Sequence, residues 1–338
     1  RPPGVHLVDG TWDFRVKANE DGSICKLKAR ICARGYKEIY GIHYLESSAP
    51  VAKLTTFRTL VAEAAHRGMQ FSVKDLSSAY LTARLDAEVF MKPLPGTAYL
   101  EREFDDVEGD GDHDGKVWKL NRPLYGLKNS GRLFHRQFRR QLVHEWKFQS
   151  GSADVCFFTK RRNGSMLRLA VFVDDLLVIN DDTDDGRAMR EEFERALTEK
   201  GYEFSTSDDN HVYLGIAIHR IAPTVIHITQ AGYIEKTMQK LGFLDRNGEM
   251  LRSPVRTPAP SGSKPVMKCD CPQGDPDKNP LRQRYLEYCG ILRWLEVGTR
   301  PDISAVLSDL CRVQVNPGKK HMERLEWHAS KGHLAGHR

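Results

Sequence analysis

The sequence lacks any apolar run that is long and uninterrupted enough to cross a bilayer, and it opens with no secretory signal peptide. Its seven cysteines are odd in number and scattered, so a full disulfide framework is not expected. A reducing compartment suits such cysteines better than an oxidising one. Together these absences favour an intracellular protein that has no membrane partner.

A strong excess of charge of one sign is also missing. Lys and Arg number 51 against 45 Asp and Glu, so the net charge of +6 permits a polyanionic partner without requiring one. At 338 residues the chain is long enough for two or three subdomains. It begins with Arg1 rather than Met and ends on a basic segment, so we interpret it as a piece of a longer polypeptide.

Zinc and calcium motifs are absent too. Cys269, Cys271 and Cys289 do not have the spacing of a zinc site. Residues 101–115 are acidic and resemble, from 110 on, the opening of a calcium-binding loop, but Asn121 stands where the twelfth-position Glu is required. We therefore predict a solvated acidic loop and no calcium site.

What the sequence does contain is an apolar run, residues 168–179, split by the adjacent acids Asp174 and Asp175. Each half has the length and β-branched character of a strand, which predicts a tight hairpin with both carboxylates at its turn. Adjacent carboxylates repel each other, and a divalent cation such as Mg²⁺ removes that penalty. The alternative is a pair of ordinary solvated turn acids, and this segment alone favours that alternative.

A third acid, Asp75, follows a short predicted strand at 71–75 and precedes small residues whose amides can approach a phosphate. An ordinary strand-to-helix junction is the alternative. If the two strands lie side by side, Asp75 meets Asp174 and Asp175. Carboxylates from two strands that hold two Mg²⁺ ions are the arrangement used for nucleotidyl transfer.

Hydrophobic periodicity and turn signals predict a mixed α+β chain. A hairpin over 12–35 places four cations on one face, where they either meet phosphates or are simply solvated: Lys26, Lys28, Arg30 and Arg34. Further strands are predicted at 155–160, 211–218 and 225–228, and helices at 54–67 (capped by Thr55 or Thr56), 182–199, 233–241, 281–297, 301–313 and 319–334.

Another helix is predicted after Gly131, because apolar residues recur every four positions from Phe134 to Trp146. Its arginines, among them Arg132 and Arg136, lie largely elsewhere on its surface. The arginine-rich face of such a helix usually only contacts solvent. Because this helix lies between the two acidic segments in the sequence, its arginines are also candidates for contact with nucleic acid.

In order and spacing, seven stretches resemble the reverse transcriptase segment of the Pol polyprotein of copia-type long-terminal-repeat retrotransposons. They are 28–36 (KARICARGY), 48–53 (SAPVAK), 75–80 (DLSSAY), 124–128 (LYGLK), 172–175 (FVDD), 213–216 (YLGI) and 299–303 (TRPDI). Each stretch is a weak signal, whereas the ordered set is specific.

The resemblance implies an α+β right-hand polymerase with fingers, a palm built on an antiparallel sheet and a helical thumb. The implied fingers are 10–53 and 84–128, the palm is 54–83 and 129–220, and a helical thumb or connection-like region is 221–338 with a linker at 253–280. The implied activity is RNA-directed DNA synthesis, in which a primer 3′-hydroxyl is extended with dNTPs on an RNA or DNA template. An RNase H domain would follow downstream in the full polyprotein, and the setting would be cytoplasm, nucleus or a virus-like particle.

The resemblance also implies residue roles. Asp75, Asp174 and Asp175 would be catalytic and would hold two Mg²⁺ ions, and Tyr80 would be the steric gate against a 2′-hydroxyl. The other implied residues are Leu76, Ser78 and Ala79 at the metal and phosphates; Lys28 and Arg30 near the triphosphate; Tyr125 and Gly126 beside nucleotide and template; and Phe172, Val173, Tyr213, Leu214, Gly215, Arg132 and Arg136 along primer and duplex.

The sequence departs from the family pattern at three places. Phe172 replaces the usual Tyr, Asn129 and Gly131 replace Gln and Pro, and residues 204–209 lack the usual Lys-Asp-Leu-Gly. These departures keep open a catalytically silent remnant that still binds nucleic acid. A metal-dependent nuclease is a third hypothesis. It is disfavoured because a nuclease would need neither Tyr80 nor residues 124–127.

Overall fold

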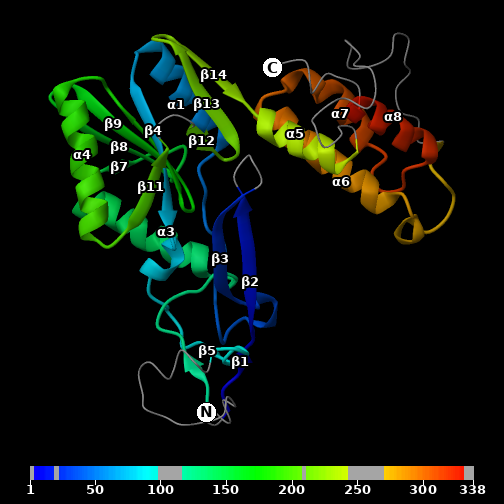
Figure 1. The fold of residues 1–338 in the computed structure, drawn as a ribbon, viewed down its shortest axis with the longest axis horizontal. Coiled ribbons are helices and arrows are strands. Elements are labelled where there is room, and N and C mark those ends of the chain that lie inside the picture. The colour runs from blue at the N-terminus through cyan, green and yellow to red at the C-terminus, as the bar shows by residue number, and fades with distance from the viewer. Residues whose placement is uncertain (1–3, 19–22, 98–115, 208–210, 243–269, 331–338) are drawn as a thin grey trace. The chain divides into compact units, whose positions relative to one another are not determined.

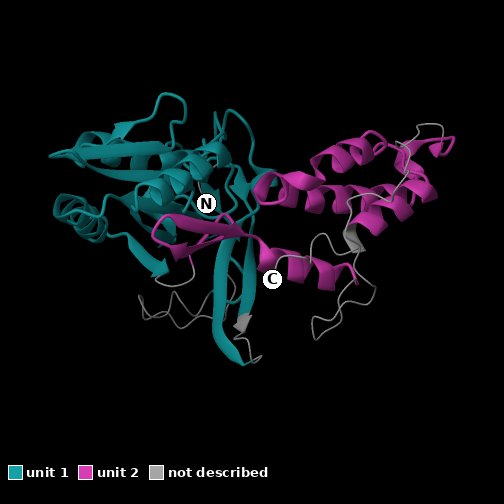
Figure 2. Cartoon of the chain, turned by 90° about the horizontal axis from the view of Figure 1, so that it is seen from above, with its two compact units in different colours: residues 1–208 teal, residues 209–338 magenta. Residues whose placement is uncertain are grey.

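The computed structural model describes residues 4–18, 23–97, 116–207, 211–242 and 270–330. The chain forms two compact units, residues 1–208 and 209–338, coloured separately in Figure 2. The predicted acidic loop at 101–115 and the linker residues 253–269 lie outside the described residues. The mixed α+β class is confirmed, whereas the boundaries of fingers, palm and thumb stay predictions.

The first unit is built on a six-stranded antiparallel sheet (Figure 1). In spatial order its strands are β11 (Glu203–Ser207), β4 (Gln70–Ser77), β10 (Asp175–Asn180), β9 (Ser165–Phe172), β8 (Phe157–Arg162) and β7 (Gln149–Ser150). The predicted apolar run supplies the two central strands, β9 and β10. Both are almost wholly buried because helices cover both faces of the sheet.

Helices α3 (Ser130–Arg140, followed by a π-helical turn at Gln141–Glu145) and α4 (Asp184–Glu199) cover one face. Phe134 and Phe138, at the predicted four-residue spacing, share a core with Leu76 and Leu176 of the sheet. Helix α1 (Leu54–His66) covers the opposite face. Arg168 alternates with the β9 residues that face α3 and α4, so it points to the other side of the sheet, where it pairs with Glu63 of α1.

The expected capping of α1 by Thr55 or Thr56 is wrong. The helix follows Lys53, and Asp154, 98 residues beyond Thr56 in the chain, accepts hydrogen bonds from the Lys53 backbone N–H (2.8 Å) and the Thr56 hydroxyl (2.5 Å). A tertiary carboxylate thus satisfies the first turn in place of a local hydroxyl. The predicted stop is confirmed, because Gly68 has a φ of +63° just beyond the helix.

The predicted N-terminal hairpin is also confirmed, as strands β2 (Gly10–Ala18) and β3 (Ile24–Ala33). Register pairs Asp13 with Arg30 and Arg15 with Lys28, so these charged residues share one face of the ribbon. Turn η1 (Gly35–Lys37) follows β3, and turn η2 (Ala79–Thr82) follows β4. Strands β1 (Leu7–Val8), β5 (Phe90–Met91) and β6 (Trp118–Lys119) form a small separate sheet.

The second unit contains a three-stranded sheet and helices. The strand predicted at 211–218 is instead a hairpin of β12 (His211–Tyr213) and β13 (Ile216–Ala222), because Leu214 and Gly215 have φ values of +55° and +72°. Strand β14 (Val225–Thr229) pairs with β13 as predicted. The helices are α5 (Ala231–Lys240), α6 (Arg282–Gly298), α7 (Ser304–Cys311, after the 3₁₀ turn Pro301–Ile303) and α8 (Lys319–Ser330).

No helix in the described part of the chain is both long and apolar enough to span a membrane.

A buried lysine lies beside the first predicted catalytic acid. The Lys74 side chain is 1% exposed, and its ammonium lies 2.8 Å from the Glu194 carboxylate of α4 and 3.0 Å from the Thr206 hydroxyl of β11. It also lies over the Phe204 ring. This ion pair anchors β4, the strand that carries Asp75, to α4.

We predict that Glu194→Ala lowers the free energy of unfolding by about 2–3 kcal/mol, because the buried ammonium loses its carboxylate partner. Glu191→Ala, on the same helix, should change it by less than about 0.5 kcal/mol, since Glu191 is exposed. Urea denaturation measures both variants. Equal stability of the two variants would contradict a stabilising role for the pair.

Candidate active site

The three predicted acids meet at one end of the central sheet. Strands β4 and β10 are antiparallel neighbours in a register that places Asp75 opposite Asp175, and Asp175 also faces Phe172 of β9. Directly opposed residues of neighbouring strands share a face, so the Asp75 and Asp175 side chains lie on one face, and Asp174 immediately precedes Asp175 in the turn. The backbone N–H of Leu76 donates to the carbonyl of Asp174 (2.8 Å), which fixes the turn against β4.

Backbone conformation at this end of the sheet is unusual. The two-residue turn is Val173–Asp174, so Asp175 is the first residue of β10 and not a turn residue as expected. Val173 has a φ of +56° and Ser78 a φ of +53°, a region that side-chain-bearing residues rarely adopt. Such conformations cost about 1–3 kcal/mol each and are concentrated at functional sites.

The carboxylates disfavour one another's ionisation. Burial raises the pKa of Asp175 to about 6, with the charges of Asp174 and Asp75 adding to the effect. Burial also raises the pKa of Asp174, and Asp75 adds to this, while a backbone hydrogen bond and the nearby Arg30 oppose it. A positive charge placed among these groups would therefore be strongly attracted.

Two tyrosines and an arginine border the acids. The Tyr80 ring, from η2, lies 4.7 Å from the Tyr125 ring, centroid to centroid, and the Arg30 guanidinium lies 5.4 Å from the Tyr125 centroid. Burial and the charge of Asp174 raise the pKa values of both tyrosines. Residues from four separate predicted motifs thus come together: Arg30, Asp75 with Tyr80, Tyr125, and Asp174.

The predicted basic residues Lys28, Arg132 and Arg136 differ from Arg30 in their neighbours. Lys28 lies two pairs further along the ribbon than Arg30, opposite Arg15. Arg132 is paired with Glu46 (2.8 Å) and Asp86 (3.1 Å), and Arg136 approaches the same Asp86 (3.4 Å).

The acidic partners Glu46 and Asp86 were missed by the sequence analysis, and no local signal identifies them because they are 46 to 86 residues away from Arg132.

Several predicted residues are distinguished by burial or by backbone conformation. Leu76 and Ala79 have buried side chains, whereas Ser78 is exposed in its left-handed conformation. Gly126 has a φ of +91°, which suits glycine. Tyr213, Leu214 and Gly215 belong to the second unit, where they form the end of β12 and the turn into β13.

The donor set suits a divalent cation by its chemistry. Three carboxylates within one small region, two of them with raised pKa values, are typical ligands for a hard ion such as Mg²⁺. As they stand, no three His, Cys, Asp or Glu side chains in the described ranges are already positioned around a common ion. The case for a cation site therefore depends on the charge of the three carboxylates and on their proximity to one another.

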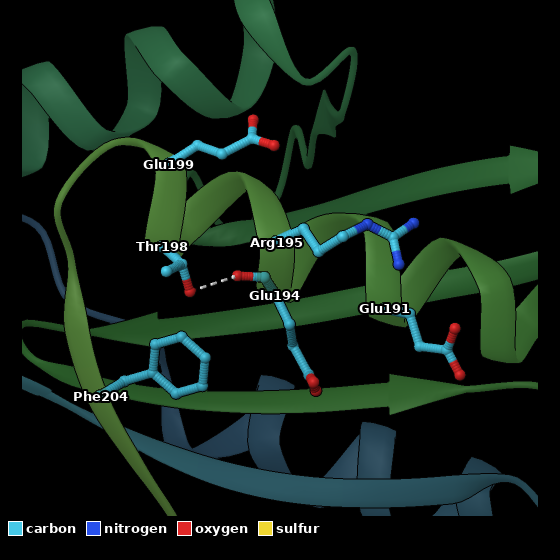
Figure 3. Close-up of a pocket in the computed structure, with 6 residues that line it drawn as sticks. All are labelled: Glu191, Glu194, Arg195, Thr198, Glu199 and Phe204. Carbon is cyan, nitrogen blue, oxygen red and sulfur yellow. Dashed lines mark hydrogen bonds between the residues drawn. The ribbon is translucent and has the colours of Figure 1, made fainter.

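A cavity of about 490 Å³ lies elsewhere, between α4 and β11 (Figure 3). It is lined by Glu191, Glu194, Arg195, Thr198, Glu199 and Phe204. Phe204 pairs with Leu76 and so faces the α4 side of the sheet, opposite Asp75 and Asp175. This cavity is not the carboxylate site.

Fold and site together define a mixed α+β protein with three carboxylates gathered at one end of its central sheet. The family model for reverse transcriptase (RNA-dependent DNA polymerase) matches residues 1–255, and the chain belongs to this family. The predicted family is thus confirmed.

Three similar proteins are retrotransposon polyproteins. The chain is 30% identical over 327 residues to the Retrovirus-related Pol polyprotein from transposon RE1 of Arabidopsis thaliana, and 29% identical over 325 residues to that from transposon RE2 of the same plant. It is 26% identical over 328 residues to that from transposon TNT 1-94 of Nicotiana tabacum. Each match covers 96% of this chain but only 20–23% of the relative, so the chain spans about a fifth of their length.

We predict that Asp175→Asn stabilises the metal-free chain at pH 7.5 by about 1–2 kcal/mol, after allowance for partial solvent screening. The folded-state pKa of Asp175 is raised from 3.8 to about 6, so its contribution to stability is full below pH 3.8 and is lost as the pH rises through about 6. The gain should vanish near pH 3.5.

Thermal melts in a chelator measure this gain, with Asp182→Asn, an exposed acid bonded to Arg187, as the control. Mg²⁺ should then stabilise the wild-type chain more than Asp175→Asn. A variant that is less stable than wild type at pH 7.5 would refute the predicted cost of ionising Asp175, which is buried and lies beside Asp174 and Asp75.

Proposed function

We propose that this chain is the polymerase domain of a retrotransposon Pol polyprotein and extends a primer 3′-hydroxyl with dNTPs on an RNA or DNA template. The observation that carries the proposal is the register of β4 and β10, which opposes Asp75 and Asp175 beside Asp174. Family membership supports the same chemistry.

In this proposal the palm corresponds to the central sheet, and the ribbon β2–β3 belongs to the fingers. Asp75, Asp174 and Asp175 would hold two Mg²⁺ ions, which would activate the primer hydroxyl and neutralise the triphosphate. The backbone of Leu76, Ser78 and Ala79 would lie at the metal and phosphates. Because Ser78 is exposed and left-handed, its local backbone is open to such an approach.

Nucleotide selection is assigned to the two packed tyrosines. The Tyr80 ring is held between Tyr125 and Phe134, so it cannot easily move aside for a ribose 2′-hydroxyl. Arg30, over Tyr125 and near Asp174, would contact the triphosphate, with Lys28 further along the same face. Gly126 would allow close approach of template or nucleotide.

The duplex would contact Phe172, Val173, Arg132 and Arg136. A primer contact at Tyr213, Leu214 and Gly215 is a separate part of the proposal and rests on the family resemblance alone. Arg136 is 59% exposed and Arg132 21%, so Arg136 is the more available of the two despite their shared partner Asp86. Affinity for the duplex should fall steeply with salt. An RNase H domain downstream and an intracellular setting belong to the same proposal.

We predict primer extension on poly(rA)/oligo(dT) with Mg²⁺, and a loss of about a thousandfold or more in Asp174→Asn, because metal-assisted charge stabilisation is worth several kcal/mol. Asp182→Asn serves as the matched control and should extend the primer at the wild-type rate. It lies in the turn just after β10 and outside the site.

If wild type and Asp174→Asn both fail to extend the primer while both bind the hybrid at low salt, the polymerase proposal is wrong. The chain would then be a nucleic-acid-binding remnant. Equal extension by both would instead refute the assignment of Asp174.

A further inference from the structure

Glu38, which directly follows turn η1, is a buried carboxylate that the proposed function does not use. Its residue is 6% exposed, and its Oε2 accepts the backbone N–H of Lys128 at 2.7 Å. Its Oε1 is buried and has no hydrogen-bond partner among the described residues. A buried carboxylate with one bare oxygen is a poor means of stabilising a fold, so its contribution is concentrated in the bond to Lys128.

That bond ties together two segments that are 90 residues apart. The end of β3 already contacts the loop 124–128, because the Ala33 N–H donates to the Tyr125 carbonyl at 2.7 Å. A Cβ at Gly126 would lie 2.1 Å from the Ala33 carbonyl oxygen, and a Cβ at Gly35 would lie 2.1 Å from the Gly126 oxygen. The two backbones therefore touch directly, and both glycines are required.

Of these connections, the Glu38–Lys128 bond is the one made by a side chain, and it lies three residues beyond Tyr125. Tyr125 packs on Tyr80 and lies under Arg30, and the charge of Asp174 adds to the effect of burial in raising the Tyr125 pKa. If the loop lifts from the end of β3, the Tyr125 ring moves relative to the acids. The Lys128 ammonium offers a weaker tie, since it bonds the exposed Tyr44 hydroxyl at 3.0 Å.

We propose that Glu38 is a positioning residue that holds the loop 124–128, and with it Tyr125 and Gly126, at the nucleotide site. This inference rests on the proposed function. Glu38 itself touches neither the acids nor, in this account, the nucleotide. Glu38 acts through the backbone of Lys128. Its loss should therefore weaken dNTP binding more than it slows nucleotide addition in the bound complex.

The test compares Glu38→Ala, Glu38→Gln and the control Glu88→Ala, an exposed acid paired with Lys119. Gln keeps an oxygen that accepts the Lys128 N–H, whereas Ala has none. We expect Glu38→Ala to raise the KM for dTTP about tenfold, equivalent to about 1.4 kcal/mol, with kcat changed less than threefold. Glu88→Ala should stay within about twofold of wild type, the range of surface substitutions. Glu38→Gln should stay within the same range because it keeps the bond to the Lys128 N–H.

Hydrogen–deuterium exchange in the free chain supplies a readout that does not need polymerisation. Peptides covering 124–130 should exchange faster in Glu38→Ala than in wild type or Glu38→Gln, while peptides from β9 and β10 should not change. An unchanged KM in Glu38→Ala, or faster exchange throughout the first unit, would overturn the inference and leave the polymerase proposal standing. If wild type itself does not extend the primer, the polymerase proposal fails and the role of Glu38 in catalysis fails with it.

Discussion

Two acidic residues face each other across the hydrogen-bonded strands β4 and β10, and the rest of the site depends on that register. A slip of one residue would turn Asp75 or Asp175 to the opposite face, into the core formed with α3 and α4. The register is held because Leu76, Leu176 and Val178 are fully buried on that face. Hydrophobic burial thus keeps like charges together against their repulsion.

The same region carries further unfavourable features. Val173 and Ser78 adopt left-handed conformations, and Asp175 has a pKa raised to about 6. A fold selected for stability alone would avoid each of them. They are compatible with a site that gains stability when a cation binds, because the repulsion is then removed. The helices on both faces of the sheet provide the stability that these features reduce.

Local pattern was sufficient to predict much of this structure. The apolar run at 168–179 gave the central hairpin, and the four-residue spacing from Phe134 gave α3, because burial on one face leaves a clear period. Asp75 was placed at the correct end of its strand, although β4 continues to Ser77. The ordered motifs identified the family, which no single motif could do.

Contacts between distant segments were not predictable in the same way. Asp154 caps α1, Asp86 pairs with Arg132, and Glu38 binds the Lys128 backbone, each across more than 40 residues. The break at Leu214–Gly215 was missed because both flanking segments read as one apolar strand. Side chains that act only through tertiary contacts leave no periodic signal.

The proposed activity requires that carboxylates from β4 and from the β9–β10 turn form one cation site. Iron-mediated affinity cleavage tests it directly, since Fe²⁺ bound in place of Mg²⁺ reduces added hydrogen peroxide to hydroxide and a hydroxyl radical, and the radical cuts the backbone next to the ion. We expect cuts at two places far apart in sequence, near Asp75 and near Asp174, both suppressed by excess Mg²⁺ and both absent in Asp174→Asn. Cuts at one place alone, or elsewhere in the chain, would contradict it.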